Sequence, residues 1–167
     1  MNKDKKMMVL YQLIKNSKKS DRELAKVLNS SQPTVTRIRK KLELTGLINE
    51  YTIIPNLVKL GFEILAFSFM NIIRTTEKNQ IDKELAEKAH SWVSSNPRII
   101  FGAGGEGLGG KNCMMITMHK NFTDFTQFIS DFRTRWSKNI KDIDTFIVPL
   151  GGKFVKQFSF RHLDEIT

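Results

Sequence analysis

The sequence predicts an α+β fold in which three short helices precede a β-α-β-β-α-β domain. Before residue 46, apolar side chains recur every three to four positions in three separate blocks, as on one face of a helix. After residue 61, apolar strand-like runs alternate with two longer helical stripes. A length of 167 residues suits one large domain or two small ones.

The composition favours a soluble, cytoplasmic protein with a polyanionic partner and no membrane partner. No apolar run approaches the roughly 18 residues of a membrane span, and the first residues lack a signal peptide's apolar core. Cys113 is the single cysteine, so no intrachain disulfide can form. Of the net charge of +10, residues 1–55 carry +7, from 12 Lys or Arg against 5 Asp or Glu. This asymmetry indicates a nucleic-acid-binding module, although a solvated basic surface explains it equally well.

The first two helical blocks are short and clearly delimited. The first block carries its apolar face on Met7, Leu10, Tyr11 and Ile14, and residues 16–19 end it. Ser20 and Glu23 have the spacing of a capping box, which starts the second helix. Leu24, Ala25, Val27 and Leu28 give that helix a buried face.

The third helix carries the chemistry. Ser31 is its expected N-cap, Pro33 sits in the first turn, and Gly46 ends it after about Thr45. At 100° per residue, the inner side that anchors the helix consists of Val35, Ile38 and Leu42. Arg39 falls on the flank of this inner side. The outer side is polar, basic and free of carboxylates, and it consists of Pro33, Thr36, Arg37, Lys40 and Lys41.

This outer side fits the major groove of double-stranded DNA, where the N-terminal part of such a helix meets base edges. We expect Gln32, Thr36 and Arg37 to read bases, and Lys40 and Lys41 to meet phosphates. The complete set of candidate DNA-contacting residues is Ser31, Gln32, Thr34, Thr36, Arg37, Lys40 and Lys41. Residues 47–55 predict strand, polar tip and strand, which is a wing. Residues 1–55 therefore predict a winged helix-turn-helix; a basic three-helix bundle that docks a protein is the alternative.

Residues 56–61 form a linker, and residues 62–167 predict a ferredoxin-like domain. Its expected elements are a strand at 62–74, a helix at 80–95, strands at 98–103 and 113–119, a helix with the stripe Phe122 to Trp136, a strand at 142–150 and an edge strand at 154–160. The first strand is apolar on both faces, and two helices cover only one face of such a sheet. An exposed apolar sheet face marks an interface, so we expect a homodimer.

Several segments of the chain resemble the leucine-responsive/asparagine-responsive (Lrp/AsnC) family of transcription regulators, of archaeal type. They are Arg22 to Leu28, Ser31 to Arg37, Lys41 to Ile48, Tyr51 to Asn56 and Leu60-Gly61. The β-α-β-β-α-β order is similar to the effector-binding and oligomerisation domain of the same family. The resemblance implies a dimer that assembles further, often to an octamer, and a small-molecule effector, commonly an amino acid, bound between dimers.

A glycine-rich loop, residues 101–112, is the candidate effector site. Its expected effector-binding residues are Gly104, Gly105, Glu106 and Gly107, whose amides can hold a carboxylate. The family's Gly-x-x-Asp turn has no Asp here, and Glu106 is the nearest acid. A flexible hairpin without a ligand is the simpler interpretation. Gly105 to Lys111 fits Gly-x4-Gly-Lys, but Asn112 and a strand follow, which disfavours a nucleotide site.

The sequence offers no catalytic grouping, cofactor site or metal site. His90, His119 and His162 are far apart, and we expect His119 at the surface and Cys113 as a small apolar residue. The predicted function is a sequence-specific, DNA-binding transcription regulator rather than an enzyme. One alternative is a nonspecific architectural DNA binder. Another is a ligand-sensing or enzymatic ferredoxin-like domain with a basic protein-docking head.

Overall fold

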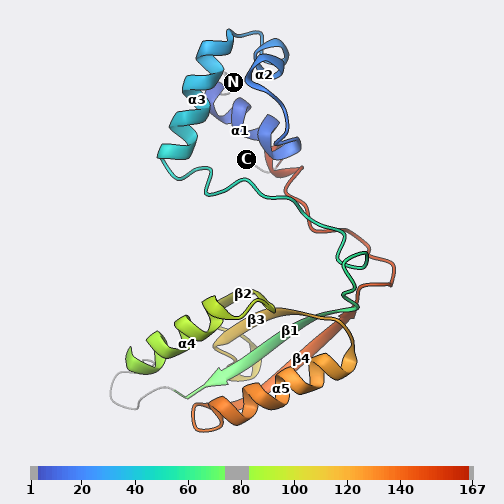
Figure 1. Ribbon diagram of the computed structural model, residues 1–167. Helices are drawn as coiled ribbons and strands as arrows, with labels where there is room; N and C mark the ends of the chain where they lie inside the picture. Colours follow the sequence, from blue (N-terminus) through green and yellow to red (C-terminus); the bar gives the residue numbers. More distant parts are fainter. Residues whose placement is uncertain (1–3, 74–82, 166–167) are drawn as a thin grey trace. The chain divides into compact units, whose positions relative to one another are not determined.

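The computed structural model describes residues 4–73 and 83–165 (Figure 1). They fall into two compact units. The first unit joins residues 1–54 to residues 154–167, and the second spans residues 55–153. No described helix is long and apolar enough to cross a membrane.

Three helices build the first unit: α1 (Lys5–Lys15), α2 (Asp21–Val27) and α3 (Gln32–Leu44). Their ends follow local rules. The Ser20 and Glu23 capping box forms as predicted, with the Ser20 hydroxyl accepting from the Glu23 amide at 3.2 Å. Ser31 caps α3, with Pro33 in its first turn. Beyond α3, Gly46 adopts a φ of +69°, a left-handed conformation that glycine reaches without strain.

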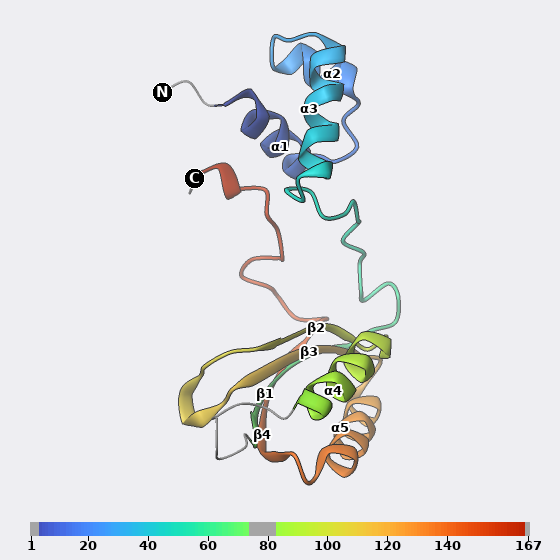
Figure 2. The ribbon, with the colours of Figure 1, turned by 90° about the vertical axis from the view of Figure 1, so that its left-hand side faces the viewer.

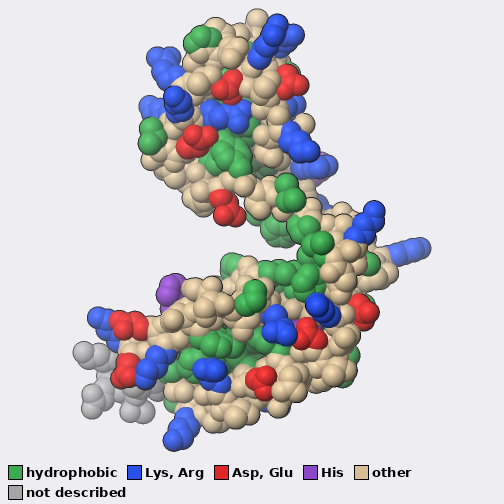
Figure 3. Space-filling view, in the orientation of Figure 1, with side chains coloured by type: hydrophobic (Ala, Val, Ile, Leu, Met, Phe, Trp, Pro, Cys, Tyr) green, Lys and Arg blue, Asp and Glu red, His purple; other side chains and the backbone are tan. Residues whose placement is uncertain are grey.

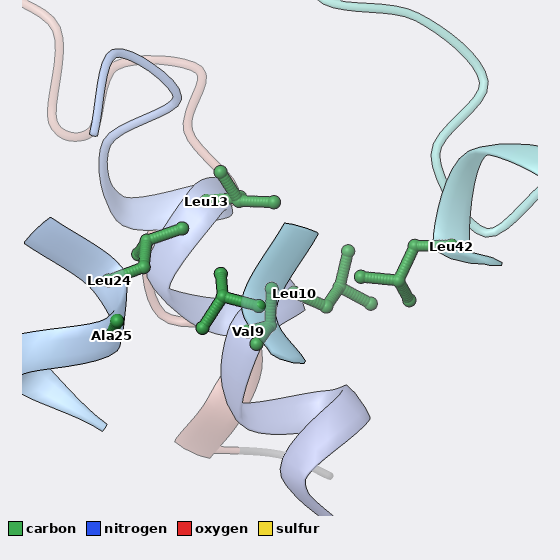
Figure 4. Close-up of a cluster of buried hydrophobic side chains, with 7 residues drawn as sticks. Val9, Leu10, Leu13, Leu24, Ala25 and Leu42 are labelled. Carbon is green, nitrogen blue, oxygen red and sulfur yellow. The ribbon is translucent and has the colours of Figure 1, made fainter. Parts of the chain in front are cut away.

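The core of the first unit lies where the three helices meet (Figure 4). Its fully or nearly buried side chains are Val9, Leu10, Leu13, Leu24, Ala25, Val35 and Leu42. The inner side of α3 is as predicted, with Ile38 partly buried beside Val35 and Leu42. On α1 the buried face is turned from the expected stripe, because Val9 and Leu13 are more deeply buried than Met7 and Ile14.

The segment after the core of the first unit differs from the predicted wing. Residues 47–55 form no strand. The amides of Leu47 and Ile48 both donate to the Leu42 carbonyl, which completes the end of α3. Tyr51 then donates its hydroxyl to Glu43 Oε1 at 2.8 Å and holds the extended chain against α3. A two-stranded ribbon this short is only marginally stable by itself, which explains the missing ladder.

The C-terminal segment also differs from the prediction. Residues 154–160 form no edge strand, and the segment from Phe154 onward belongs to the first unit rather than to the sheet domain. Phe158 and Phe160 line a groove together with side chains of α1, among them Leu10 and Ile14. The short helical turn η2 (Leu163–Glu165) brings Asp164 to 2.6 Å from the Lys15 ammonium. Gly151 and Gly152 follow the last sheet strand and lie in a turn where the chain leaves the sheet.

The second unit is an antiparallel sheet covered on one face by two helices (Figures 1 and 2). Its strand order is β2-β3-β1-β4, the order of the predicted ferredoxin-like arrangement. The strands are β1 (Ile64–Ile72), β2 (Ile99–Gly104), β3 (Cys113–His119) and β4 (Ile140–Pro149), and the helices are α4 (Lys83–Ser95) and α5 (Phe122–Trp136). A short turn, η1 (Leu108–Gly110), lies in the glycine loop. The expected first residues of α4, 80–82, lie outside the described residues.

The core of the second unit fills the space between the sheet and α5. Its buried side chains include Met70, Met115, Phe125, Phe128 and Phe132. Ser68 and Thr117 are fully buried among them, and the Ser68 hydroxyl lies 3.0 Å from that of Thr145 on β4.

The expectation that His119 lies at the surface is wrong. Its side chain is fully buried, because alternate residues of β3 face α5 and His119 shares the parity of Met115 and Thr117. The imidazole Nε2 lies 2.8 Å from the Thr117 hydroxyl, and the ring packs against Phe125 and Phe128. Burial lowers the pKa of His119.

Candidate nucleic-acid interface

The outer side of α3 forms a shallow hollow on the first unit. The residues that line it are Gln32, Pro33, Thr36, Arg37, Lys40, Lys41 and Leu44. All but Thr36 are exposed. The hollow thus gathers three cations and one amide with no carboxylate in its lining, and Lys and Arg side chains are frequent on the visible face of this unit (Figure 3).

Asp21, the first residue of α2, accepts hydrogen bonds from two side chains of α3. The Thr36 hydroxyl donates to Asp21 Oδ2, and Arg39 Nε donates to Asp21 Oδ1, both at 2.7 Å. Arg39 also donates from Nη2 to the Lys19 carbonyl at 2.9 Å. We call this set the Asp21 clamp. The clamp fixes α3 on α2. Arg39, which was predicted on the flank of the inner side, therefore stabilises the packing of the two helices.

Two further candidates lie at the start of α3. The Ser31 hydroxyl accepts from the Thr34 amide at 3.4 Å and lies 2.8 Å from the Thr34 hydroxyl. Ser31 is exposed and Thr34 is half-buried. Both hydroxyls therefore hold the N-terminal turn of the helix, beside the exposed Gln32 that follows the cap.

Tyr51 and Glu43 make another polar contact at this helix. Burial and the hydrogen bond to Glu43 raise the pKa of the Tyr51 phenol. Glu43 accepts this hydrogen bond and does not line the hollow, so Arg37, Lys40 and Lys41 are the charged residues of the lining.

The second unit presents a bare, apolar sheet face. On β1, Leu65, Phe67 and Phe69 alternate with the residues that face the helices. Pairing places Phe67 between Ile116 of β3 and Phe146 of β4. Phe146 is 67% exposed and Phe69 is 39% exposed. The prediction of an apolar face opposite the helices is thus confirmed around Phe67, whereas Asp144 of β4 pairs with Phe69 at one end of the same face. We call this surface the open sheet face.

The glycine loop is a closed hairpin between β2 and β3. Among the four predicted effector residues, Gly105 and Gly107 donate their amides within the hairpin, to the Asn112 carbonyl at 3.0 Å and the Lys111 carbonyl at 2.7 Å. Glu106 is exposed and lines a groove with Gly107, Gly110, Lys111 and Lys141. Gly104 ends β2.

Two side chains anchor the base of this hairpin. Asn112 both accepts from the Ile72 amide and donates to the Ile72 carbonyl, each at 2.8 Å, in the manner of a strand residue. The Lys111 ammonium is paired with Asp142 and lies 2.8 Å from Asp144. A lysine neutralised in this way is not available to a phosphate, and β3 follows it instead of a helix. Within residues 4–73 and 83–165, no three His, Cys, Asp or Glu side chains gather as a metal site.

Sequence reasoning missed the Asp21 clamp and the position of the C-terminal segment. Asp21 lies 15 and 18 residues from its two partners, and no local pattern links them. An acidic residue is common in the first turn of a helix because it interacts favourably with the helix dipole. The presence of Asp21 at this position therefore did not indicate a contact with α3.

Comparison with known proteins places this geometry in a family. Residues 3–49 match the winged helix-turn-helix DNA-binding family. An HTH-type transcriptional regulator of Pyrococcus abyssi is 32% identical over 142 residues, which cover 85% of this chain and 88% of the relative. Another, from Pyrococcus horikoshii, is 27% identical over 150 residues, which cover 89% of this chain and 93% of the relative.

Solved structures share the fold over nearly the whole chain. The crystal structure of the Pyrococcus horikoshii protein matches with a TM-score of 0.71 and 26% identity, over 92% of this chain and 94% of that one. A transcriptional regulator from Neisseria meningitidis in complex with L-Met has a TM-score of 0.75 at 17% identity, over 98% and 99% of the two chains. AsnC of E. coli has a TM-score of 0.68 at 17% identity, over 92% and 95%. This protein belongs to the Lrp/AsnC family of helix-turn-helix, DNA-binding transcription regulators.

Proposed function

We propose that the protein is a sequence-specific regulator that binds double-stranded DNA in the cytoplasm, with α3 in the major groove. The observation that supports this most is the carboxylate-free hollow on α3. Arg37 is exposed there and presents the paired donors that suit a guanine edge, and Gln32 presents an amide that suits adenine. Lys40 and Lys41, further along the helix, contact phosphates.

The Asp21 clamp refines the roles of the other candidates. The Thr36 hydroxyl is already donated to Asp21, so Thr36 positions the helix and offers its methyl group, rather than its hydroxyl, to a base. Ser31 and Thr34 hold the first turn by capping it and bring Gln32 to the DNA. Base readout therefore rests on Gln32 and Arg37.

The test is a salt series with a selected DNA site and with random-sequence duplex. We expect the selected site to bind about a thousandfold tighter than random duplex. Arg37→Ala should cost about 1–3 kcal/mol at the selected site and little on random DNA. Lys59→Ala is a matched control, because it removes one cation from an exposed position of the second unit.

The outcomes separate the alternatives. Binding with little preference for any sequence would favour an architectural DNA binder. An absence of binding at low salt would overturn the DNA proposal and favour a ligand-sensing or enzymatic domain with a protein-docking head.

The assembly proposed is a homodimer formed through the open sheet face. A contiguous apolar surface of this kind is costly in water, and a second copy that presents the same aromatic residues would bury it. Such a dimer carries two copies of α3 for a two-fold DNA site. Phe67→Glu combined with Phe146→Glu should yield monomers in sedimentation velocity. Larger species, up to an octamer, would appear as faster boundaries in the parent chain.

The effector proposed is an amino acid at the groove of the glycine hairpin. Glu106 can receive the ammonium group and Lys141 the carboxylate, since both are exposed and line the same groove. The regulator from Neisseria meningitidis was solved with L-Met, which supports a ligand of this class. The amides of Gly105 and Gly107 donate hydrogen bonds within the hairpin, so they stabilise the hairpin and do not bind the ligand. The test is a thermal-shift panel of amino acids with the parent chain and with Glu106→Gln, which should lose the stabilisation by the amino acid that binds. If no amino acid raised the Tm of the parent chain, this part of the proposal would be withdrawn.

A further inference from the structure

Helix α4 covers its part of the sheet loosely. None of its residues is fully buried, although α5 buries three phenylalanines on the same sheet face. Val93 of α4 lies near β2, since its Cγ1 would be 3.3 Å from a Cβ added to Gly102. Two of the α4 side chains that line this space, Ala86 and Ala89, are small, and β2 contributes Gly102, Ala103 and Gly104. A cavity of about 260 Å³ remains between α4, α5 and the sheet.

The lining of this cavity is mainly apolar and partly aromatic, with His90 and Asn139 as its polar side chains, and apolar side chains are visible between α4 and α5 (Figure 3). Trp92, Phe132 and Trp136 contribute three rings, with centroids 5.5 Å apart for Trp92 and Phe132 and 6.0 Å apart for Trp92 and Trp136. Among the described residues, no Lys, Arg, Asp or Glu lines it. A zwitterionic amino acid would lose its hydration there without an ion partner, so this cavity suits a different ligand from the glycine hairpin.

One polar group of the cavity wall stands out. The indole Nε1 of Trp136 is buried and has no hydrogen-bond acceptor within the described part of the chain. A buried donor left without an acceptor destabilises a protein, and native structures contain few of them. Because this nitrogen is covered in the ligand-free chain, a bound molecule would have to displace the indole slightly to place an acceptor on the N–H.

The size of the cavity limits that molecule. Protein interiors are close-packed, and a dry apolar cavity of ~150 Å³ suffices to bind benzene. A cavity nearly twice as large accommodates a fused pair of rings. We propose that the space beneath α4 is a binding site for an uncharged, mainly aromatic molecule of about ten heavy atoms that accepts one hydrogen bond from Trp136.

Quinoline and naphthalene form a matched pair of probes, because they share one shape and differ by a single acceptor nitrogen. In titrations of the full chain followed by calorimetry, we expect quinoline to bind once per chain and about three- to tenfold tighter than naphthalene. Trp136→Phe should bind both with equal affinity. If Trp136→Phe kept the preference for quinoline, the assignment of Trp136 as donor would be overturned.

A second variant tests the cavity without any ligand. Ala89→Leu should fill the void, abolish binding of both probes and raise the Tm of the second unit. Ser91→Leu puts the same side chain at an exposed position of α4 and should leave binding unchanged. If Ala89→Leu lowered the Tm relative to Ser91→Leu, the space would already be packed, since extra methylene groups in a full core destabilise it. That result, or an absence of saturable binding by either probe, would overturn the proposal.

Discussion

Removing Asp21 should destabilise the DNA-binding unit and leave the sheet unit unchanged. In Asp21→Ala, Arg39 loses a charge-assisted hydrogen bond, which contributes about 1.5–3 kcal/mol, and Thr36 loses a neutral one, which contributes about 1 kcal/mol. The side chains of Arg39 and Asp21 are 19% and 20% exposed, so water partly screens and partly replaces the pair. We therefore expect a loss of about 2–3 kcal/mol in the free energy of unfolding of the first unit.

The placement of the aromatic residues allows each unit to be followed separately. Trp92 and Trp136, the two tryptophans of the chain, both lie in the second unit, so their fluorescence reports the unfolding of that unit. Far-UV circular dichroism reports the helices of both units. In urea, Asp21→Ala should shift the phase of the dichroism that belongs to the first unit by about 1–2 M to lower concentration. The tryptophan transition should stay in place.

Glu50→Ala is the matched control. It also removes one negative charge from the first unit, but at an exposed position. A double-mutant cycle of Asp21→Ala with Arg39→Met should give a coupling of about 1 kcal/mol or more. If Asp21→Ala unfolded at the same urea concentration as Glu50→Ala, the clamp would contribute no net stability and the reasoning would be refuted.

Three further predictions concern charge, protonation and the cysteine. Lys40→Ala combined with Lys41→Ala should reduce the slope of log K against log salt by about 2 in DNA titrations, and an unchanged slope would exclude both from phosphate contact. Burial lowers the pKa of His119 in the folded state, so the unfolded state binds the proton more tightly and the stability of the second unit should fall as the pH drops below about 6.5. In urea titrations followed by tryptophan fluorescence, His119→Leu should remove this dependence between pH 7 and pH 5. The hydrogen bond from Arg98 lowers the pKa of Asp124, so its own contribution is lost only at lower pH and does not interfere. Burial raises the pKa of the Cys113 thiol, so it should react with a thiol reagent at least about tenfold slower in the folded chain than in urea, and equal rates would contradict its burial.

The sequence alone determined the features that depend on neighbouring residues. The Ser20 capping box, the Ser31 cap with Pro33 and the Gly46 end place α2 and α3 because a cap satisfies backbone groups within one turn. The bounds of β3 and the order of strands and helices follow from the spacing of apolar residues, which repeats every two residues along a strand and every 3.6 along a helix. The exposed basic side of α3, and with it Arg37, follows from the same periodicity.

Only the tertiary structure decided what depends on partners distant in the chain. The sequence does not link Asp21 to Thr36 and Arg39, because that contact requires α2 and α3 to cross at one particular place. His119 is buried because Phe125 and Phe128 of α5 pack against its ring. The alternation along a strand predicts which side chains share a face, but not which element packs on that face. The segment from Phe154 onward has the alternation of a strand, but it packs in the first unit, because the apolar groove beside α1 exists only once the chain has folded.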